Sequence, residues 1–560
     1  MGRSSLWVRW RRAPSRLALV AVCVGGALLE AGALRGANFV EAIPFAPQVT
    51  APPPYGAFHD LRWLIVYNHS WLSLAWEVVL VVVLRGVVTA CLARLAWPIS
   101  VPRPPWPSLI LRGLASALLS LIVLSPGATV AFAGGVTSLS WFVLGMLIPL
   151  FVTFLVFPHG GFQARWWRRW PPLVAIAVSA LTFWVLTAGG LVLTYAPGWS
   201  VVPVAGVVGL YNAWAWTKML AALEHRGAQA KRAPVGAGLL VVTVGVFLVA
   251  AVAPLAGFRS KVSVPPGAVG SPPAGSPDGT PLLVVDGFNS SYDGHPHARF
   301  GARFLTQHYS YRGSGPNGYP EPYGPSATHQ SLDHSARLLG RQIAELHQRT
   351  GKPVDLVAVS EGTAVVRLYL AGHPRPPVAR VVLTSPLVQP SRVGYPPAGH
   401  QGWGLAGGWE ARELLSLVHL EDPSITIRAD SPFVRSFITH GALLRDRILC
   451  PVPGVALHVF LPLASAAVAP PGPLGEASTT VLPAVHGGLV STGAVRAQVA
   501  AKLSGRPVPP QPLWGAAYAL VRGSAAAWEI PSLPLAWLAP TASHLPDPAF
   551  GGNGCTARGA

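Results

Sequence analysis

Long apolar runs with few charges between them dominate the first half of the chain. Each run is close to the roughly 20 residues that a helix needs to cross a bilayer core of about 30 Å. The sequence therefore predicts a multi-pass transmembrane region over residues 1–257, with about seven helices. The expected spans are Leu17 to Leu34, Leu72 to Leu92, Leu109 to Phe132, Leu139 to Phe157, Leu173 to Leu193, Val201 to Leu220 and Val235 to Leu255.

The pattern changes after residue 280, where short apolar runs alternate with amphipathic stretches. Val354 to Val359 is typical of a buried strand. Ser331 to Gln348 has apolar positions at spacings of three and four, as in a helix with one covered face. This alternation predicts an α/β domain over residues 281–512, with a mostly parallel sheet and helices on both faces.

Three further segments surround or interrupt the predicted α/β domain. Residues 258–280 are rich in Pro, Gly and Ser, so we expect an extended, mobile linker that does not fix the domain rigidly. An insertion over about 391–447 interrupts the α/β domain and contains Trp403, Trp409 and Phe433. Residues 513–560 form a tail that we expect to pack on the α/β domain.

The distribution of basic residues predicts the orientation in the membrane. The chain is 51% hydrophobic and 11% charged, with 41 Lys and Arg against 22 Asp and Glu. Basic side chains gather before the first span and in alternate connections, which the positive-inside rule places in the cytoplasm. The N-terminus is then cytoplasmic, and because the expected number of spans is odd, the α/β domain is extracytoplasmic. Because topology explains the basic excess, no nucleic-acid partner is needed. The basic residues concerned are Arg3, Arg9, Arg11, Arg12, Arg16, Arg94, Arg103, Arg165, Arg168, Arg169, Arg226, Lys231 and Arg232.

Several polar or reactive residues need interpretation in this frame. The first span could instead be a signal peptide, although its length and Glu30 favour retention. Glu77 and Arg85 lie on roughly one face of one predicted span, where a functional role competes with a simple position near the interface. Cys450 and Cys555 both fall outside the membrane, so an oxidising compartment permits one disulfide between them. No metal-binding spacing of Cys or His is present, and no metal or cofactor is expected.

A candidate nucleophile lies where the Val354 to Val359 strand meets the next helix. The segment reads Val-Asp-Leu-Val-Ala-Val-Ser-Glu-Gly-Thr, and a helix is expected over Glu361 to Ala371. Ser360 is therefore at a sharp strand-to-helix corner, with the small residues Ala358 and Gly362 beside it. This is the pattern of a G-x-S-x-G elbow with Ala in the first position.

Two further motifs stand in the order that such an elbow requires. Pro281 to Ser291 is an apolar strand that runs into a loop of small residues, and Thr479 to Leu489 is a strand that ends near His486. Together with Ser360, they resemble the lipase and esterase-like members of the α/β-hydrolase superfamily. The resemblance implies an α/β-hydrolase-type sheet, a Ser360–His486 pair and an oxyanion hole formed by the amides of Phe288 and Glu361. It also implies that the insertion over about 391–447 is a cap, whose aromatic side chains indicate an apolar acyl or alkyl substrate.

The third member of the expected triad is missing from its usual place. The family carries a carboxylate after the penultimate strand, here Val455 to Leu463, but the chain continues with small and apolar residues that include Ser465. Ser465 could hold His486 through its hydroxyl, or Glu476 could reach His486 if its loop folds back. In the best-studied triad, loss of this carboxylate slows catalysis on the order of ten-thousandfold.

The sequence predicts a membrane-anchored, extracytoplasmic serine hydrolase, an esterase or lipase that acts on apolar acyl esters. Two alternatives remain open at this point. One is an acyltransferase or thioesterase that uses the same Ser360–His486 pair. The other is a catalytically inactive, hydrolase-like binding or scaffold protein, which the missing acid favours. Membrane lipid and a small-molecule or lipid ester are the expected partners.

Overall fold

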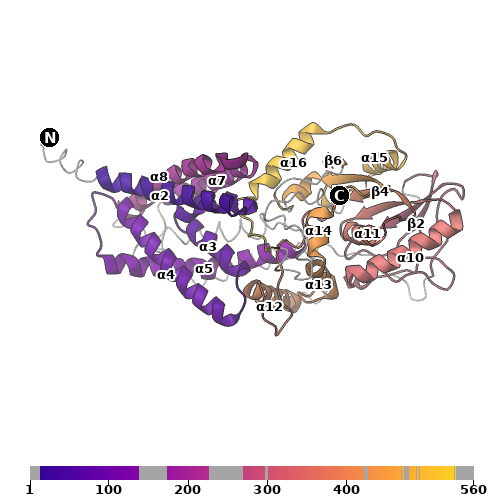
Figure 1. The fold of residues 1–560 in the computed structure, drawn as a ribbon, viewed down its shortest axis with the longest axis horizontal. Helices are drawn as coiled ribbons and strands as arrows, with labels where there is room; N and C mark the ends of the chain where they lie inside the picture. Colours follow the sequence, from indigo (N-terminus) through magenta and orange to yellow (C-terminus); the bar gives the residue numbers. More distant parts are fainter. Residues whose placement is uncertain are drawn as a thin grey trace.

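The computed structural model describes residues 13–137, 173–225 and 269–537, apart from short gaps at 297–299, 422–426, 468, 472–477, 487–488, 491 and 535–536. A bundle of long helices is followed along the chain by an α/β domain, and the two lie end to end along the long axis of the molecule (Figure 1). The expected spans Leu139 to Phe157 and Val235 to Leu255 lie outside the described residues.

Four of the described helices are long and apolar enough to cross a membrane: Ser15–Gly36, Trp71–Ala96, Trp106–Thr137 and Val174–Tyr195. They correspond to α2, α4, α5 and α7, and each covers one of the expected spans. α8 covers a fifth but contains Asn212, Lys218 and Glu224, so it is less apolar. The bundle helices are α2 (Ala13–Gly36), α3 (Tyr55–Val66), α4 (Trp71–Ala96), α5 (Trp106–Thr137), α7 (Leu173–Tyr195) and α8 (Val201–His225).

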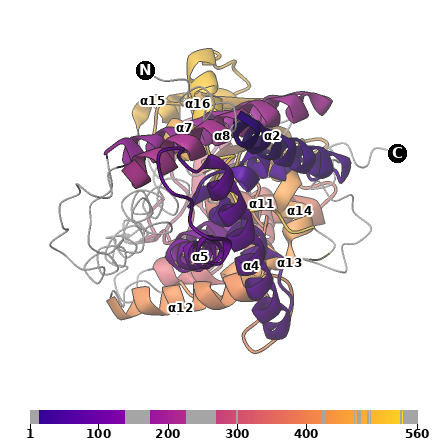
Figure 2. The ribbon, with the colours of Figure 1, turned by 90° about the vertical axis from the view of Figure 1, so that its left-hand side faces the viewer.

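The bundle helices pack through small residues. Viewed along the long axis, α2, α7 and α8 lie together, and α4 lies beside α5 (Figure 2). α4 and α5 cross at Gly86 and Gly113, where a Cβ on Gly113 would lie 2.2 Å from the carbonyl oxygen of Gly86. Only glycine permits this approach, which brings two backbones into van der Waals contact as in other membrane helix pairs.

The connection between α2 and α4 is folded, which the sequence pattern does not predict. It forms η1 (Val40–Thr50) and then α3, and both are largely buried in the bundle. Arg62 of α3 is fully buried, and its guanidinium is stacked on the rings of Phe45 and Phe58 at 3.9 and 4.6 Å. From the charge of its side chain alone, we would expect Arg62 to lie in a solvent-exposed loop. Aromatic faces and hydrogen bonds make its burial possible.

The α/β domain is built on a six-stranded, all-parallel sheet in the order β2-β1-β3-β4-β5-β6. The strands are β1 (Thr280–Val285), β2 (Phe304–His308), β3 (Val354–Val359), β4 (Val378–Thr384), β5 (Ala456–Pro462) and β6 (Ser478–Leu482). The helices of this domain are α10 (Leu332–Thr350), α11 (Glu361–Gly372), α12 (Leu405–Glu421), α13 (Pro432–Thr439), α14 (Gly441–Arg447), α15 (Gly493–Leu503) and α16 (Pro512–Ser524), with the short η6 (Pro325–His329) and η7 (Leu463–Ala467).

Alternate residues of each strand enter different cores, as the pleat requires. Leu283 of β1 and Leu356 of β3 pack with α10 and α11 on one face of the sheet. Leu282 and Val357 enter a second core with α15 on the other face. The predicted α/β domain, with its mostly parallel sheet and helices on both faces, is therefore confirmed.

The carboxyl edge of this sheet faces the bundle. After β4 the chain turns toward the end of α5, where the amides of Ser391 and Arg392 donate to the carbonyls of Val136 and Gly135 at 2.9 and 3.0 Å. The insertion after this turn contains α12, α13 and α14, and α12 packs against α5 and α3. Glu410 of α12 accepts hydrogen bonds from Ser125 and Thr129 of α5. The cap thus joins the sheet to the bundle.

The described part of the α/β domain packs on the bundle, where the sequence pattern predicts a loose attachment. Two hydrogen bonds join Ala274, in the described part of the Pro/Gly/Ser-rich segment, to Thr306 of β2. The main core of the α/β domain is continuous with that of the bundle, because Phe132 and Phe183 belong to the same buried cluster as Leu356. Burial of this apolar surface holds the two parts together more strongly than a linker alone.

Residues 525–533, which we name the strap, lie after α16 and enter the bundle. Trp528 is 1% exposed and is stacked on Phe183 with a centroid distance of 4.6 Å. Its indole donates to Thr187 Oγ1 at 2.8 Å. Arg62 donates to the carbonyl of Ala527 at 2.7 Å. The expectation that the tail packs on the α/β domain describes only part of it. α16 contacts both η7 of that domain and α7 of the bundle, and the strap continues into the bundle.

Trp528→Ala should weaken the attachment of the α/β domain. Removing a fully buried Trp leaves a cavity and removes the indole that donates to Thr187 Oγ1, with an expected loss of about 3–5 kcal/mol. The measurement is the unfolding midpoint of the detergent-solubilised chain, together with protease sensitivity of the α/β domain. Leu513→Ala on α16 is the control, because Leu513 is 72% exposed. If both variants resist protease as the native chain does, the strap is not what holds the domain.

Cys450 is disulfide-bonded, whereas Cys23 and Cys91 are free thiols. The chain has four cysteines, and the fourth, Cys555, lies outside the described residues. Cys450 is buried just before β5, and its carbonyl accepts a hydrogen bond from Arg367 of α11 at 2.9 Å. The bridge to Cys555 that we expect from the sequence stays a prediction.

Candidate active site

Ser360 lies at the carboxyl end of β3, where the chain turns directly into α11. Its φ of 51° and ψ of −117° are left-handed values that a residue with a Cβ rarely adopts. The turn is possible because its neighbours are small: a Cβ on Gly362 would lie 2.5 Å from the carbonyl oxygen of Val285. Strain of this kind costs of order 1–3 kcal/mol and tends to occur at functional sites.

His486 follows β6 and lies beside Ser360. The Ser360 Oγ atom is 2.9 Å from His486 Nε2. The His486 carbonyl accepts a hydrogen bond from Ser385 Oγ at 2.6 Å, and the Ser385 amide donates to Phe460 of β5 at 3.0 Å. The ends of three neighbouring strands thus hold the backbone of His486 in place. The two residues that the sequence suggested for nucleophile and base are within hydrogen-bond distance of each other.

A hydroxyl group occupies the position opposite Ser360 on the imidazole. Ser465 is in η7, which follows β5, and its Oγ is 3.0 Å from His486 Nδ1. η7 is joined to the His486 loop by a hydrogen bond from the Ala464 amide to the Ala484 carbonyl, at 3.1 Å. When Nε2 accepts the Ser360 proton, Nδ1 carries the other hydrogen and donates it to Ser465. The alternative partner, Glu476, lies outside the described residues.

The electrostatic consequence is that His486 has a neutral partner. Burial lowers the pKa of the His486 imidazole below its usual value. A carboxylate at Nδ1 would oppose this effect by favouring the imidazolium. Ser465 can orient the ring, but it carries no charge to stabilise the imidazolium that forms when Ser360 loses its proton.

The loop after β1 lies directly against the Ser360 corner. A Cβ on Gly287 would lie 2.9 Å from the Ser360 Cβ and 3.5 Å from the Glu361 amide nitrogen, so only glycine fits. Tyr311 fixes this loop by donating its hydroxyl to the Asp286 carbonyl at 2.7 Å. Phe288, the next residue, is stacked between His329 and Phe433 of α13, with centroid distances of 4.7 and 4.8 Å. Backbone amides of this loop and of the α11 N-terminus thus lie near Ser360.

The Glu361 side chain points into the core and not into the site. It is 1% exposed, and neither of its carboxyl oxygens has a hydrogen-bond partner among the residues that the structure describes. Burial raises the pKa of this carboxyl well above its usual value and so favours its neutral form. This leaves only its amide for the role that the resemblance implies.

Sequence reasoning did not identify two positioning residues, Ser385 and Tyr311, because both act through hydrogen bonds to distant backbone groups. Their sequence signals are weak: a serine after a strand and a tyrosine after another.

As for metals, the described residues contain no group of three or more His, Cys, Asp or Glu side chains arranged to hold an ion.

Comparisons with known proteins add little to this geometry. No protein-family model matches the chain, and no curated protein matches it. Among solved structures, lipase B of Aspergillus fumigatus is similar over 52% of this chain and 70% of its own, with 13% sequence identity and a TM-score of 0.27. A likeness at this level carries no argument about function, so the proposed function rests on the geometry of the site.

Proposed function

We propose that the chain is a membrane-bound serine hydrolase that cleaves apolar acyl esters. The observation that carries the proposal is the strained Ser360 corner with its Oγ 2.9 Å from His486 Nε2. A positive φ at a residue with a side chain is retained where the surrounding structure imposes it, and here it directs the hydroxyl to a histidine.

In this mechanism Ser360 Oγ attacks the ester carbonyl carbon while His486 Nε2 takes the hydroxyl proton. The carbonyl oxygen gains the negative charge, which the amides of Phe288 and Glu361 stabilise. Collapse of the intermediate breaks the bond to the alcohol, which receives the proton from His486. Water then attacks the acyl-serine by the same route and releases the acid.

The position of the site supports a lipid substrate. The carboxyl edge of the sheet faces the bundle, and the cap helix α13 places Phe433 on Phe288 beside the proposed oxyanion hole. Phe288 is only partly buried, so an acyl chain that enters from the membrane would contact its ring, and an aromatic contact favours an apolar ligand.

We propose that the N-terminus is cytoplasmic and that the α/β domain is extracytoplasmic. Several basic side chains belong to helix ends that lie far from the α/β domain in Figure 1: Arg16 near the start of α2, Arg94 in the last turn of α4 and Arg112 near the start of α5. Arg35, in the last turn of α2, is at the opposite end of that helix. The connection between α7 and α8, residues 196–200, has no Lys or Arg. This distribution supports the orientation through the positive-inside rule.

One observation favours a second candidate, a hydrolase-like protein that binds but does not cleave. Ser465 provides a hydroxyl where a carboxylate would stabilise the imidazolium, so the chemical step receives less assistance. A protein that no longer acts as an enzyme would keep the fold, but selection would no longer maintain a carboxylate at this position.

A fluorophosphonate probe that cannot cross membranes tests both parts of the proposal. Intact cells that express the chain should be labelled at Ser360, because an activated serine on the outside attacks the phosphorus of the probe, displaces fluoride and becomes phosphonylated. A permeable fluorophosphonate is the parallel measurement, and a Ser360→Ala chain is the control. Labelling by the permeable probe alone would overturn the orientation. Absence of labelling by both probes would overturn the enzyme and leave the binding protein.

A further inference from the structure

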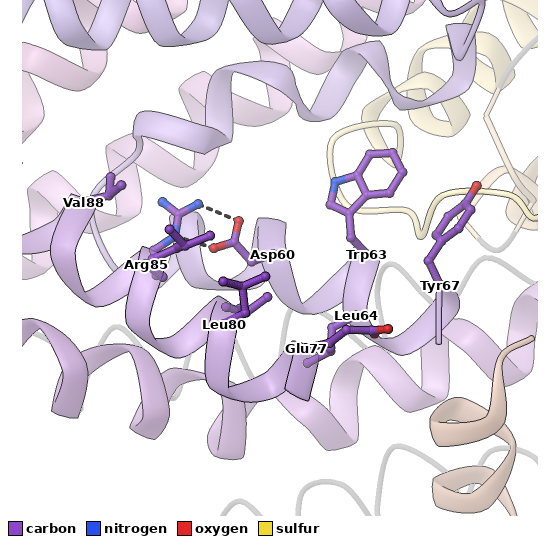
Figure 3. Close-up of a pocket in the computed structure, with 10 residues that line it drawn as sticks. Asp60, Trp63, Leu64, Tyr67, Glu77, Leu80, Arg85 and Val88 are labelled. Atoms are coloured by element: carbon purple, nitrogen blue, oxygen red, sulfur yellow. Dashed lines mark hydrogen bonds and ion pairs between the residues drawn. The ribbon is translucent and has the colours of Figure 1, made fainter. Parts of the chain in front are cut away.

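A second candidate site lies in the bundle, between α3 and α4. The structure has a cavity there of about 400 Å³, lined by both helices and by Tyr67, which follows α3 (Figure 3). Its wall is mostly apolar and includes Leu64, Leu80 and Leu84. Leu80 and Leu84 are 43% and 56% exposed on the outer face of α4, so the cavity opens toward the surface that lipid would cover.

One end of the cavity is closed by charges that already have partners. Arg85 donates from Nε and Nη2 to the two oxygens of Asp60, at 2.5 and 2.6 Å, and from Nη1 to the Val49 carbonyl at 2.7 Å. Asp60 also contacts His59 Nδ1 at 2.8 Å, and His59 Nε2 is 2.5 Å from Glu30 of α2. A ligand would find no unpaired cation among the described residues of this lining. The sequence pattern did not identify Asp60 as the partner of Arg85.

The other end carries a carboxylate without an ion-pair partner. Glu77 is eight residues from Arg85 on α4, or about 12 Å along the helix axis, and among the described residues no basic side chain pairs with it. Figure 3 shows Glu77 and Tyr67 at the end of the cavity away from the Asp60–Arg85 pair. Because that pair is neutral overall, the charged side chains of the lining sum to one negative charge, on Glu77.

Two aromatic rings line the same cavity as this carboxylate. Trp63 and Tyr67 both line the cavity, and their centroids are 5.5 Å apart with an interplanar angle of 42°. The Tyr67 hydroxyl donates to the Ser532 carbonyl of the strap at 2.7 Å, which fixes the ring. Aromatic faces beside a carboxylate attract organic cations, and the attraction is stronger where water is excluded.

We propose that this cavity binds a membrane amphiphile with an ammonium headgroup. The ammonium would lie between Glu77 and the rings of Trp63 and Tyr67, and the alkyl chain would extend along Leu80 and Leu84. Charge selects the class of ligand, because an anionic headgroup would meet the unpaired Glu77 and no free cation of the described lining. The inference rests on the proposed membrane placement of the bundle and not on the hydrolase chemistry.

Photoreactive dodecyl probes test the proposal on the purified full chain in a non-ionic detergent. One probe carries trimethylammonium and the other a carboxylate, and each has a diazirine on the same carbon of the alkyl chain. The ammonium probe should label α3 and α4 at a concentration at least about tenfold lower than the carboxylate probe, which corresponds to about 1.4 kcal/mol. Peptide mapping by mass spectrometry gives the labelled residues.

Variants separate charge from shape. Glu77→Gln should weaken labelling by the ammonium probe about tenfold, and Glu77→Lys should reverse the preference between the two probes. Leu84→Trp should fill the cavity and block labelling. Leu72→Trp is its matched control, because Leu72 is on the same helix, 84% exposed, and does not line the cavity.

Three outcomes would overturn the proposal: equal labelling by both probes, a folded Glu77→Lys chain that still prefers ammonium, or labelling that Leu84→Trp leaves unchanged. The unfolding midpoint of each variant shows whether it is folded. Ser360→Ala should be labelled like the native chain, so loss of the proposed hydrolase and loss of this site are distinguished.

Discussion

Ser360→Ala should lower the hydrolysis of a short-chain chromogenic ester by about a thousandfold or more, to near the rate without protein. The variant lacks the oxygen that would attack the ester carbonyl, while the proposed oxyanion amides and His486 remain. His486→Gln should cause a similar loss, because the two side chains act as a unit and their effects do not add. Initial rates of the purified, detergent-solubilised chain give the comparison.

The strained backbone at Ser360 provides a test of folding for the same series. Glycine adopts a φ of 51° without a steric penalty, whereas alanine retains that penalty. Ser360→Gly should therefore be as inactive as Ser360→Ala but unfold at a higher temperature. Ser478→Ala is the control for a serine substitution, since Ser478 is exposed on β6. Equal rates for the native chain and both Ser360 variants would remove the enzyme and leave the binding protein.

Ser465→Asp should raise esterase activity by about tenfold to a thousandfold. Ser465 Oγ is already 3.0 Å from His486 Nδ1, so a carboxylate from this position would accept the Nδ1 hydrogen and stabilise the imidazolium of the transition state. Ser465 is 9% exposed, and the room around it sets where the gain falls in that range. Ser465→Asn is the matched control, because it has nearly the same shape and no charge.

The pH dependence gives this prediction a second readout. His486 acts as a base only when neutral, so activity is present above its pKa and lost as the pH falls through it. Burial lowers that pKa in the native chain, which extends activity to lower pH than an exposed histidine would. A new aspartate favours the imidazolium and raises the pKa of His486, so the acid limb of the Ser465→Asp profile should move to higher pH.

Two results would contradict this account of Ser465. If the aspartate variant is folded and its rate and acid limb are unchanged, another acid such as Glu476 already serves His486. If Ser465→Asn gains as much activity as Ser465→Asp, charge is not the cause. Either outcome would leave the Ser360 prediction intact, because that variant tests the nucleophile and not the partner of the base.

Local patterns along the chain were sufficient to predict much of this structure. Runs of about 20 apolar residues predict membrane-length helices because a bilayer sets the length, and four such helices occur among the described residues. The strand-to-helix change at Ser360 is also local, since Val354 to Val359 and the small Gly362 determine the turn between them. The parallel sheet follows from alternating strands and helices, because each crossover needs a covering helix.

The partners of polar groups needed the tertiary structure. Arg85 is paired with Asp60, which is 25 positions away on another helix, and Ser465 meets His486 only because η7 and the loop after β6 converge at one sheet edge. The strap and the cap were likewise beyond sequence reasoning, since Trp528 and Glu410 contact bundle residues hundreds of positions away. Hydrophobic periodicity along the chain predicts the long bundle helices and strands such as β3, but it does not predict η1 and α3. Only the tertiary structure decides which buried charges and rings meet. A buried polar group needs a hydrogen-bond partner, and the packing determines which group is near enough to provide it.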